Sequence, residues 1–241
     1  MLRGAALFAA LAALPLLGGC DAPWNDDAAR AETARDFPPA DRPVAPTVST
    51  KWSTEEARDR VNEAEDVMDS ADVRPGMTVA DIGAGDGYYT VRLAQRVGAG
   101  GRVLAQDIMP EVIERLADRV TRERLDNVSV KLGAVDDPRL PANSFDRVFM
   151  VHMYHEIGEP YAFLWRLRPA LRAGGQVLVV DGDRPIADHG TPFRLLVCEF
   201  EAVGYKLVSY DDKQHAGGYL ARFVPEGKRP APRDIKVCQN P

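Results

Sequence analysis

The chain is poor in cysteine and in excess positive charge, and each shortage excludes a class of protein. Three cysteines in 241 residues are too few for a disulfide-based scaffold. The 30 Lys and Arg residues are outnumbered by 36 Asp and Glu, which gives a net charge of −6. Nucleic-acid-binding proteins normally present a basic face, so we expect no nucleic-acid partner. The remaining composition, 45% hydrophobic and 27% charged, is ordinary for a globular protein.

The N-terminal apolar run is too short to span a bilayer. It extends from Ala5 to Leu17, well below the ~20 residues that a transmembrane helix needs, and it contains Pro15. A single charge, Arg3, precedes the run and small residues follow it, which is the order of a secretory signal. We therefore predict that residues 1–19 are a signal peptide. The alternative is a misplaced start ahead of a cytoplasmic enzyme.

The residues that follow predict an anchor and a tether. Leu17-Gly18-Gly19-Cys20 resembles the lipobox of bacterial lipoproteins, in which the cysteine thiol is lipidated. This resemblance implies lipidation of Cys20 and an exported, membrane-anchored lipoprotein that faces the periplasm. Residues 20–50 have no apolar period, and Pro38, Pro39, Pro43 and Pro46 favour extended, solvated chain. We expect this segment to be a lipid-anchored disordered linker.

From about residue 51 the chain alternates between helix-like and strand-like stretches. Ser53-Thr54-Glu55-Glu56 has the form of a capping box and predicts a helix that extends to about Ser70. Further helices are expected at 88–97, 110–122, 160–172 and 193–203, and Gly174-Gly175 is expected to end the helix at 160–172. Strands are expected at 77–82, 102–107, 128–132, 145–151, 176–180, 205–210 and 218–224.

This alternation predicts an α/β fold. The middle strands are almost entirely apolar, which indicates a parallel sheet covered on both faces. The last two strands are separated by only about seven residues, too few for a parallel crossover, so we expect them to be antiparallel. The prediction is a Rossmann-like, doubly wound sheet with five parallel strands and an antiparallel final pair.

A glycine-rich loop follows the first predicted strand and is the strongest indication of a ligand. Gly83-Ala84-Gly85-Asp86-Gly87 has G-x-G-x-G spacing, unlike the G-x-G-x-x-G of dinucleotide enzymes. Asp81 places a carboxylate under the loop, where it would repel a pyrophosphate but suit a ligand with an ammonium and a sulfonium group. Asp107 ends the second predicted strand, where a carboxylate can accept hydrogen bonds from both hydroxyls of a ribose.

At these residues the chain resembles the class I S-adenosylmethionine-dependent methyltransferases. The resemblance covers about Lys51 to Pro225 and includes the loop, Leu104–Asp107, Gly133–Asp146 and the Leu171–Gly175 turn, where Ala173 replaces the usual proline. It implies a sheet of order 3-2-1-4-5-7-6, a methyltransferase domain at 51–225 and a C-terminal tail at 226–241. It also implies S-adenosylmethionine as cofactor. The cofactor-binding residues that it implies are Asp81, Gly83, Ala84, Gly85, Gly87, Asp107, Ile108, Ala134, Val135, Asp136 and His152, with Asp136 near the adenine amino group.

Candidate catalytic residues follow the fourth predicted strand. The segment His152-Met153-Tyr154-His155-Glu156 resembles the "YHE" segment of a largely uncharacterised subgroup of these methyltransferases. His155 is the first candidate for a base or for a group that orients the acceptor, and Tyr154 and Glu156 come next. The alternative is that the histidines only bond loop backbone. We expect no metal site, because H-E-x-x-H spacing is absent, although Asp181 and Asp183 make a mixed His/Asp site geometrically possible.

Two questions stay open at this point. Cys198 and Cys238 form a disulfide if the chain is exported, and otherwise Cys198 is a buried free thiol, the alternative that we prefer. The predicted function is methyl transfer from S-adenosylmethionine to an unidentified small molecule or envelope component. The alternative is a non-catalytic envelope lipoprotein that uses the fold for binding. Its motive is that S-adenosylmethionine is made in the cytosol, whereas the predicted signal peptide would export the chain.

Overall fold

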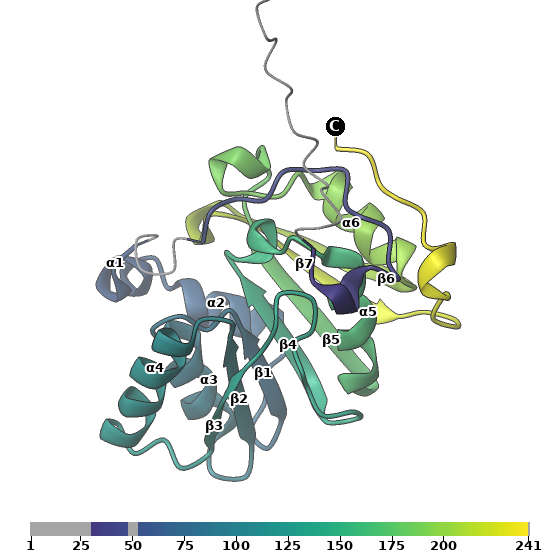
Figure 1. The fold of residues 1–241 in the computed structure, drawn as a ribbon. Helices are drawn as coiled ribbons and strands as arrows, with labels where there is room; N and C mark the ends of the chain where they lie inside the picture. Colours follow the sequence, from purple (N-terminus) through teal and green to yellow (C-terminus); the bar gives the residue numbers. More distant parts are fainter. Residues whose placement is uncertain (1–29, 48–52, 241) are drawn as a thin grey trace, which may run out of the picture.

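The computed structural model describes residues 30–47 and 53–240, which form a sheet of seven strands flanked by helices (Figure 1). The strand order is β3-β2-β1-β4-β5-β7-β6, with the first five strands of the chain parallel and β7 antiparallel to both β5 and β6. This confirms the predicted Rossmann-like fold class. The strands are β1 (Thr78–Ile82), β2 (Arg102–Asp107), β3 (Val128–Leu132), β4 (Phe145–Val151), β5 (Leu171–Asp181), β6 (Tyr205–Lys213) and β7 (Gly218–Pro225).

Helices cover both faces of the sheet because successive side chains of a strand point to opposite sides. Val79 and Leu178 pack with α2 and α3, while Ala80 and Val177 pack with α5 and α6. Each face therefore has its own buried apolar cluster. The helices are α1 (Glu55–Arg60), α2 (Glu63–Ser70), α3 (Tyr88–Val97), α4 (Pro110–Arg122), α5 (Pro160–Leu167) and α6 (Phe193–Ala202).

The first predicted helix is divided in two. Asn62 has a φ of 55° between α1 and α2, a left-handed conformation that asparagine tolerates better than most residues. The N-cap is Thr54 rather than Ser53, since the Thr54 hydroxyl accepts from the backbone N–H of Ala57 at 3.2 Å. The break places Glu63 at the start of α2, where its side chain turns into the core.

The double glycine belongs to β5 and not to a helix end. Helix α5 stops at Leu167, and Pro169 lies in the short 3₁₀ turn that follows, because proline cannot continue a helix. Gly174 has a φ of 77°, and a Cβ at Gly175 would lie 2.7 Å from the carbonyl oxygen of Phe145. The glycines therefore permit an irregular start of β5 against β4.

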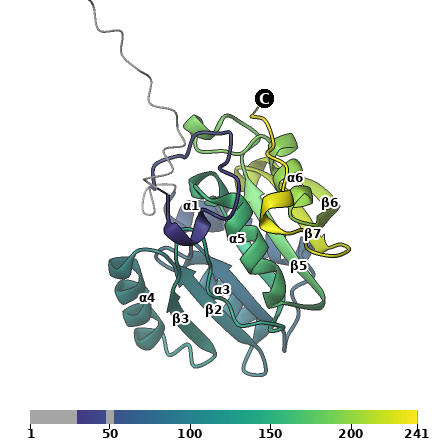
Figure 2. The same ribbon diagram turned by 45° about the vertical axis from the view of Figure 1, so that its right-hand side comes forward.

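Residues 30–47, here called the strap, are packed against the domain (Figures 1 and 2). Ala34, Phe37 and Ala40 are buried in the apolar cluster on the α5–α6 face. Arg42 is buried and its Nε donates to Glu199 of α6 at 2.8 Å. The expectation of a solvated linker is therefore wrong for these residues, because they bury apolar surface and an ion pair.

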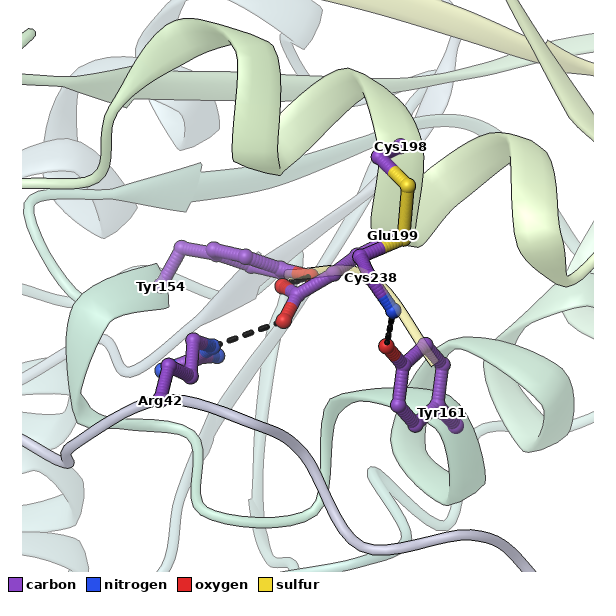
Figure 3. Close-up of a disulfide and its surroundings, with 6 residues drawn as sticks. All are labelled: Arg42, Tyr154, Tyr161, Cys198, Glu199 and Cys238. Atoms are coloured by element: carbon purple, nitrogen blue, oxygen red, sulfur yellow. Dashed lines mark hydrogen bonds and ion pairs between the residues drawn. A yellow bond between two sulfur atoms is a disulfide. The ribbon is translucent and has the colours of Figure 1, made fainter. Parts of the chain in front are cut away.

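The C-terminal tail is held by a disulfide between Cys198 of α6 and Cys238 (Figure 3). The preferred alternative of a free Cys198 is therefore wrong. The backbone N–H of Cys238 also donates to the Tyr161 hydroxyl at 2.7 Å. Asp41 of the strap forms a parallel bridge with Gln239, so the strap lies beside the tail.

The predicted signal peptide at 1–19 and the predicted lipidation site Cys20 lie outside the described residues. Within 30–47 and 53–240, no helix combines the length and the apolar character that crossing a membrane requires.

Candidate functional site

A cavity of about 700 Å³ lies at the carboxyl ends of β1, β2 and β4. Ile82, Asp107 and Val151 bring these strand ends to its wall. In open α/β sheets the ligand lies beyond the carboxyl ends of the strands, and the volume is typical of small-molecule sites. The strap and α1 supply further wall, through residues such as Arg42 and Arg58.

The glycine loop forms one side of the cavity, as the sequence predicts. Gly83, Gly85 and Gly87 have φ values of 66°, 55° and 90°, all in the left-handed region that favours glycine. A Cβ at Gly83 would lie 2.9 Å from Met153, and one at Gly87 would lie 2.6 Å from Leu116. Gly83, Ala84 and Gly85 line the cavity, and the backbone approaches it closely because no side chain intervenes.

Of the two predicted carboxylates, Asp107 lies on the cavity wall and Asp81 does not. Asp107 lines the cavity and is fixed by the backbone N–H groups of Gly85 and Met109, each at 3.1 Å. Asp81 lies beneath the loop, where it accepts from the Thr90 hydroxyl at 2.6 Å, and it is not on the cavity wall. Burial raises the pKa of Asp81 to about 6. Asp107 is thus placed for direct contact with a ligand, and Asp81 supports the loop from below.

The expected adenine side is apolar and partly exposed. Ile108 and Val135 are 40% and 51% exposed, and both line the cavity together with Ala134. Asp136 differs from the expectation, because its carboxylate accepts from Thr33 of the strap and from Arg166, each at 2.5 Å. Asp136 is buried and is not among the cavity-lining residues. It is therefore placed to fix the strap and not to contact a base.

His152 lines the cavity and contacts the buried carboxylate of Glu63, a contact that the sequence did not indicate. Its Nε2 lies 3.5 Å from Glu63 Oε1, and Arg58 forms a two-pronged contact with the same carboxylate at 2.6 and 3.0 Å. Burial alone would raise the pKa of Glu63, but the hydrogen bonds and positive charge of His152 and Arg58 lower it to about 2. Only the break between α1 and α2 brings these residues together.

His155 is buried at the cavity wall with a fixed orientation. Its Nδ1 lies 3.0 and 3.1 Å from the two carboxylate oxygens of Asp181 at the end of β5. Asp181 also accepts from the Thr191 hydroxyl at 2.7 Å and from the backbone N–H of Gly182 at 2.9 Å. The carboxylate therefore holds the imidazole through Nδ1 and leaves Nε2 for another partner.

Tyr154 is not placed for chemistry. Its ring is fully buried, and its hydroxyl donates to Glu199 at 2.7 Å beside Arg42 (Figure 3). Burial raises the pKa of this hydroxyl well above its ordinary value. Tyr154 is absent from the cavity wall, whereas the neighbouring Glu156 lines it. Of the three candidate catalytic residues, His155 and Glu156 thus face the cavity and Tyr154 belongs to the core.

Gln106 is a cavity residue that the sequence analysis missed. It is buried at the end of β2, and its amide nitrogen has no hydrogen-bond partner among the residues that the structure describes. An unpartnered buried donor is costly, so its place on the cavity wall points to a ligand with a hydrogen-bond acceptor. The sequence did contain a signal for it, because Gln106 directly precedes Asp107 at the carboxyl end of a predicted strand, where the ligand is expected.

Residues 79–175 match a methyltransferase domain. The match includes the glycine loop, Asp107 and His155, whereas the strap, His189 and both cysteines of the disulfide lie outside it. The match covers β2, β3 and β4 in full, all of β1 except its first residue, and the start of β5. It therefore coincides with the part of the sheet that carries the cavity.

Among curated proteins, the chain is similar to methyltransferases. It is 40% identical over 82 residues to nocamycin O-methyltransferase of Saccharothrix syringae, covering 34% of this chain and 29% of that one. It is 32% identical over 116 residues to protein-L-isoaspartate O-methyltransferase of Methanothrix thermoacetophila, covering 48% and 52%. The chain thus spans about half or less of the length of these relatives.

Among solved structures, a SAM-dependent methyltransferase from Aquifex aeolicus superposes with a TM-score of 0.62 at 22% sequence identity. The alignment covers 71% of this chain and 97% of that chain. This likeness shows that the chain has the methyltransferase fold.

Proposed function

We propose that the chain transfers the methyl group of S-adenosylmethionine to a small-molecule or envelope acceptor. The single observation that carries the proposal is the cavity wall, on which the glycine loop, Asp107 and an apolar pair lie together. The match of residues 79–175 to a methyltransferase domain and the identity of the curated relatives support it.

The residues of the cavity fit this cofactor. The loop from Gly83 to Gly85 offers backbone to the methionine part, where any Cβ at Gly83 would clash. Asp107 offers a fixed carboxylate to the ribose hydroxyls, and Ile108 and Val135 offer apolar surface to the adenine. The buried amide nitrogen of Gln106 offers a donor that no described protein group uses.

Bound S-adenosylmethionine supplies a methyl group already activated by the positive charge on sulfur. The protein therefore contributes mainly by holding the two reactants in line, an effect that can reach ~7–11 kcal/mol. The Asp181 carboxylate fixes the His155 ring, which is the group placed to orient an acceptor or to take its proton. The strap covers His155, since the backbone N–H of Ala45 donates to the His155 carbonyl at 3.1 Å, and so helps to exclude water.

Calorimetry on the full chain tests the proposal. We expect binding of S-adenosylmethionine and of its demethylated product, weakened at least about tenfold by Asp107→Ala because the buried carboxylate is lost. Asp126→Ala, at an exposed position between α4 and β3, is the matched control and should bind as the wild type does. No detectable binding of either compound would refute the proposal. Binding without methylation of any compound in an envelope extract supplied with labelled cofactor would favour the non-catalytic alternative.

We also propose that the chain is an exported lipoprotein anchored through Cys20. The signal-like order of residues 1–19 supports this, and so does the disulfide, because disulfides persist in oxidising compartments. Radiolabelled fatty acid should enter the wild type and not Cys20→Ser, and a reporter fused after Pro241 should be active only in the periplasm. A reporter active only in the cytoplasm would contradict this proposal and leave the proposed cofactor untouched.

A further inference from the structure

Three possible metal ligands meet beside the cavity. His155, Glu156 and His189 bring two imidazole nitrogens and a carboxylate oxygen within 4.8 Å of one another. His155 and Glu156 lie in a 3₁₀ turn (Tyr154–Glu156) after β4, and His189 follows a second 3₁₀ turn (Ile186–Asp188) after β5. The two strands are neighbours in the sheet, so their carboxyl ends deliver the three side chains to one place.

The partner of His155 is the kind that accompanies a metal-binding histidine. A ligating imidazole usually donates its other ring N–H to a carboxylate, which fixes the tautomer and strengthens the ligand. Asp181 stands at 3.0 Å from His155 Nδ1 and is itself held by Thr191 and the backbone of Gly182. Because Nδ1 is occupied by Asp181, Nε2 is the ring nitrogen of His155 that can bind a metal ion.

His189 is held in an unusual conformation at the cluster. Its φ is 55°, a left-handed value that is uncommon for a residue other than glycine and that often marks functional sites. Arg184 fixes this turn by donating to the carbonyl oxygens of Asp188 and His189, each at 2.8 Å. The Nδ1 atom of His189 is buried and has no hydrogen-bond partner among the described residues. The turn therefore presents an imidazole whose Nδ1 the described residues leave without a hydrogen bond.

We propose that His155, Glu156 and His189 bind a divalent first-row transition metal ion. Two imidazoles and one carboxylate suit Zn²⁺ or Fe²⁺, and three protein ligands leave a coordination position open. His155 and Glu156 line the cavity, so the open position would be accessible from the cavity and would take an oxygen or nitrogen lone pair of an acceptor. This proposal differs from the sequence-based expectation of no metal site. The sequence did not indicate the site because His189 is distant in the chain from His155 and Glu156. With the metal bound, Nε2 of His155 is a ligand and takes no proton, so His155 serves to orient the acceptor. The proposed binding of S-adenosylmethionine is a separate property.

Metal uptake by the full chain tests the site directly. Protein without an affinity tag is stripped with a chelator, then titrated with Co²⁺ and followed by its visible absorption, and Zn²⁺ content is measured by mass spectrometry. We expect about one ion per chain. His189→Asn should weaken binding at least about tenfold, and asparagine is chosen because it tolerates the left-handed φ. Asp181→Asn should weaken it about 10–100-fold by removing the partner of His155.

His215→Asn is the matched control, because His215 is exposed and its ring contacts Asp66 away from the cluster. It should bind metal as the wild type does. Glu156→Gln gives a second ligand variant of nearly unchanged shape, and urea unfolding of the same samples shows whether each variant retains its fold. Metal uptake well below one ion in the wild type, or equal affinity in the wild type and both ligand variants, would overturn the metal site, whatever the outcome for the cofactor.

Discussion

The disulfide should contribute substantially to the stability of the tail and the strap. It closes a loop of 40 residues between Cys198 and Cys238, and this loop contains β6 and β7. In the chain-entropy model, closing a loop of that length stabilises the folded state by about 4 kcal/mol. The half-cystine at Cys238 also packs in a small apolar cluster with Ala45 of the strap, Ile186 and Leu195. Its loss should therefore loosen the strap as well as the tail.

Urea unfolding of the full chain, with and without a reducing agent, measures this contribution. We expect reduction to lower the free energy of unfolding by about 2–4 kcal/mol, since measured effects often fall below the entropic value. A variant with both cysteines replaced by serine should resemble the reduced wild type and should no longer respond to the reductant. A difference below about 1 kcal/mol between oxidised and reduced wild type would refute the reasoning, because the loop-closure term would then be absent.

Three further predictions concern buried charges. Arg42→Met should lower the free energy of unfolding in urea by about 3–5 kcal/mol, because it leaves Glu199 buried without its cation. Adding Glu199→Gln should recover part of this loss. An unchanged midpoint of urea unfolding in Arg42→Met would contradict this reasoning. The pKa of Glu63 is lowered to about 2, so its contribution is complete above its ordinary pKa near 4.5 and disappears between pH 4.5 and 2. That contribution is about 3 kcal/mol, and Glu63→Gln should reduce the pH dependence of stability in that window by about this amount, while Glu55, Asp59 and Asp66, whose pKa values are also lowered, keep the rest. The pKa of Asp81 is raised to about 6, so stability should instead fall as the pH rises through 6, and Asp81→Asn should abolish that fall; thermal unfolding at pH 4 and 7 checks the sign.

The elements of the sheet were predictable because their signals are local. Strand β2, helix α3 and helix α4 have the predicted bounds. Each has a local boundary signal, since β2 begins directly after Gly101, α3 ends before Gly98 and α4 begins with Pro110. The glycine loop was predictable for the same reason, as was the position of Asp107. The antiparallel pair followed from the shortness of its connection.

The errors concern contacts between distant parts of the chain. The strap contains Ala34, Phe37 and Ala40 without a regular period, so composition indicated a solvated linker where the structure buries these side chains. Nothing near Asp136 in the sequence indicates that its carboxylate accepts a hydrogen bond from the Thr33 hydroxyl. The meeting of His155 with His189 likewise depends on the order of β4 and β5 in the sheet.

The strap also sets how far the cavity can move from a membrane. Arg30 of the strap lines the cavity and comes 30 − 20 = 10 residues after Cys20. Ten residues span at most about 35 Å even when fully extended. With the proposed anchor at Cys20, the cavity would stay within that distance of the lipid headgroups. Acceptors embedded in the bilayer surface, or released from it, would then meet the site by diffusion in a thin layer rather than through the whole volume of the compartment.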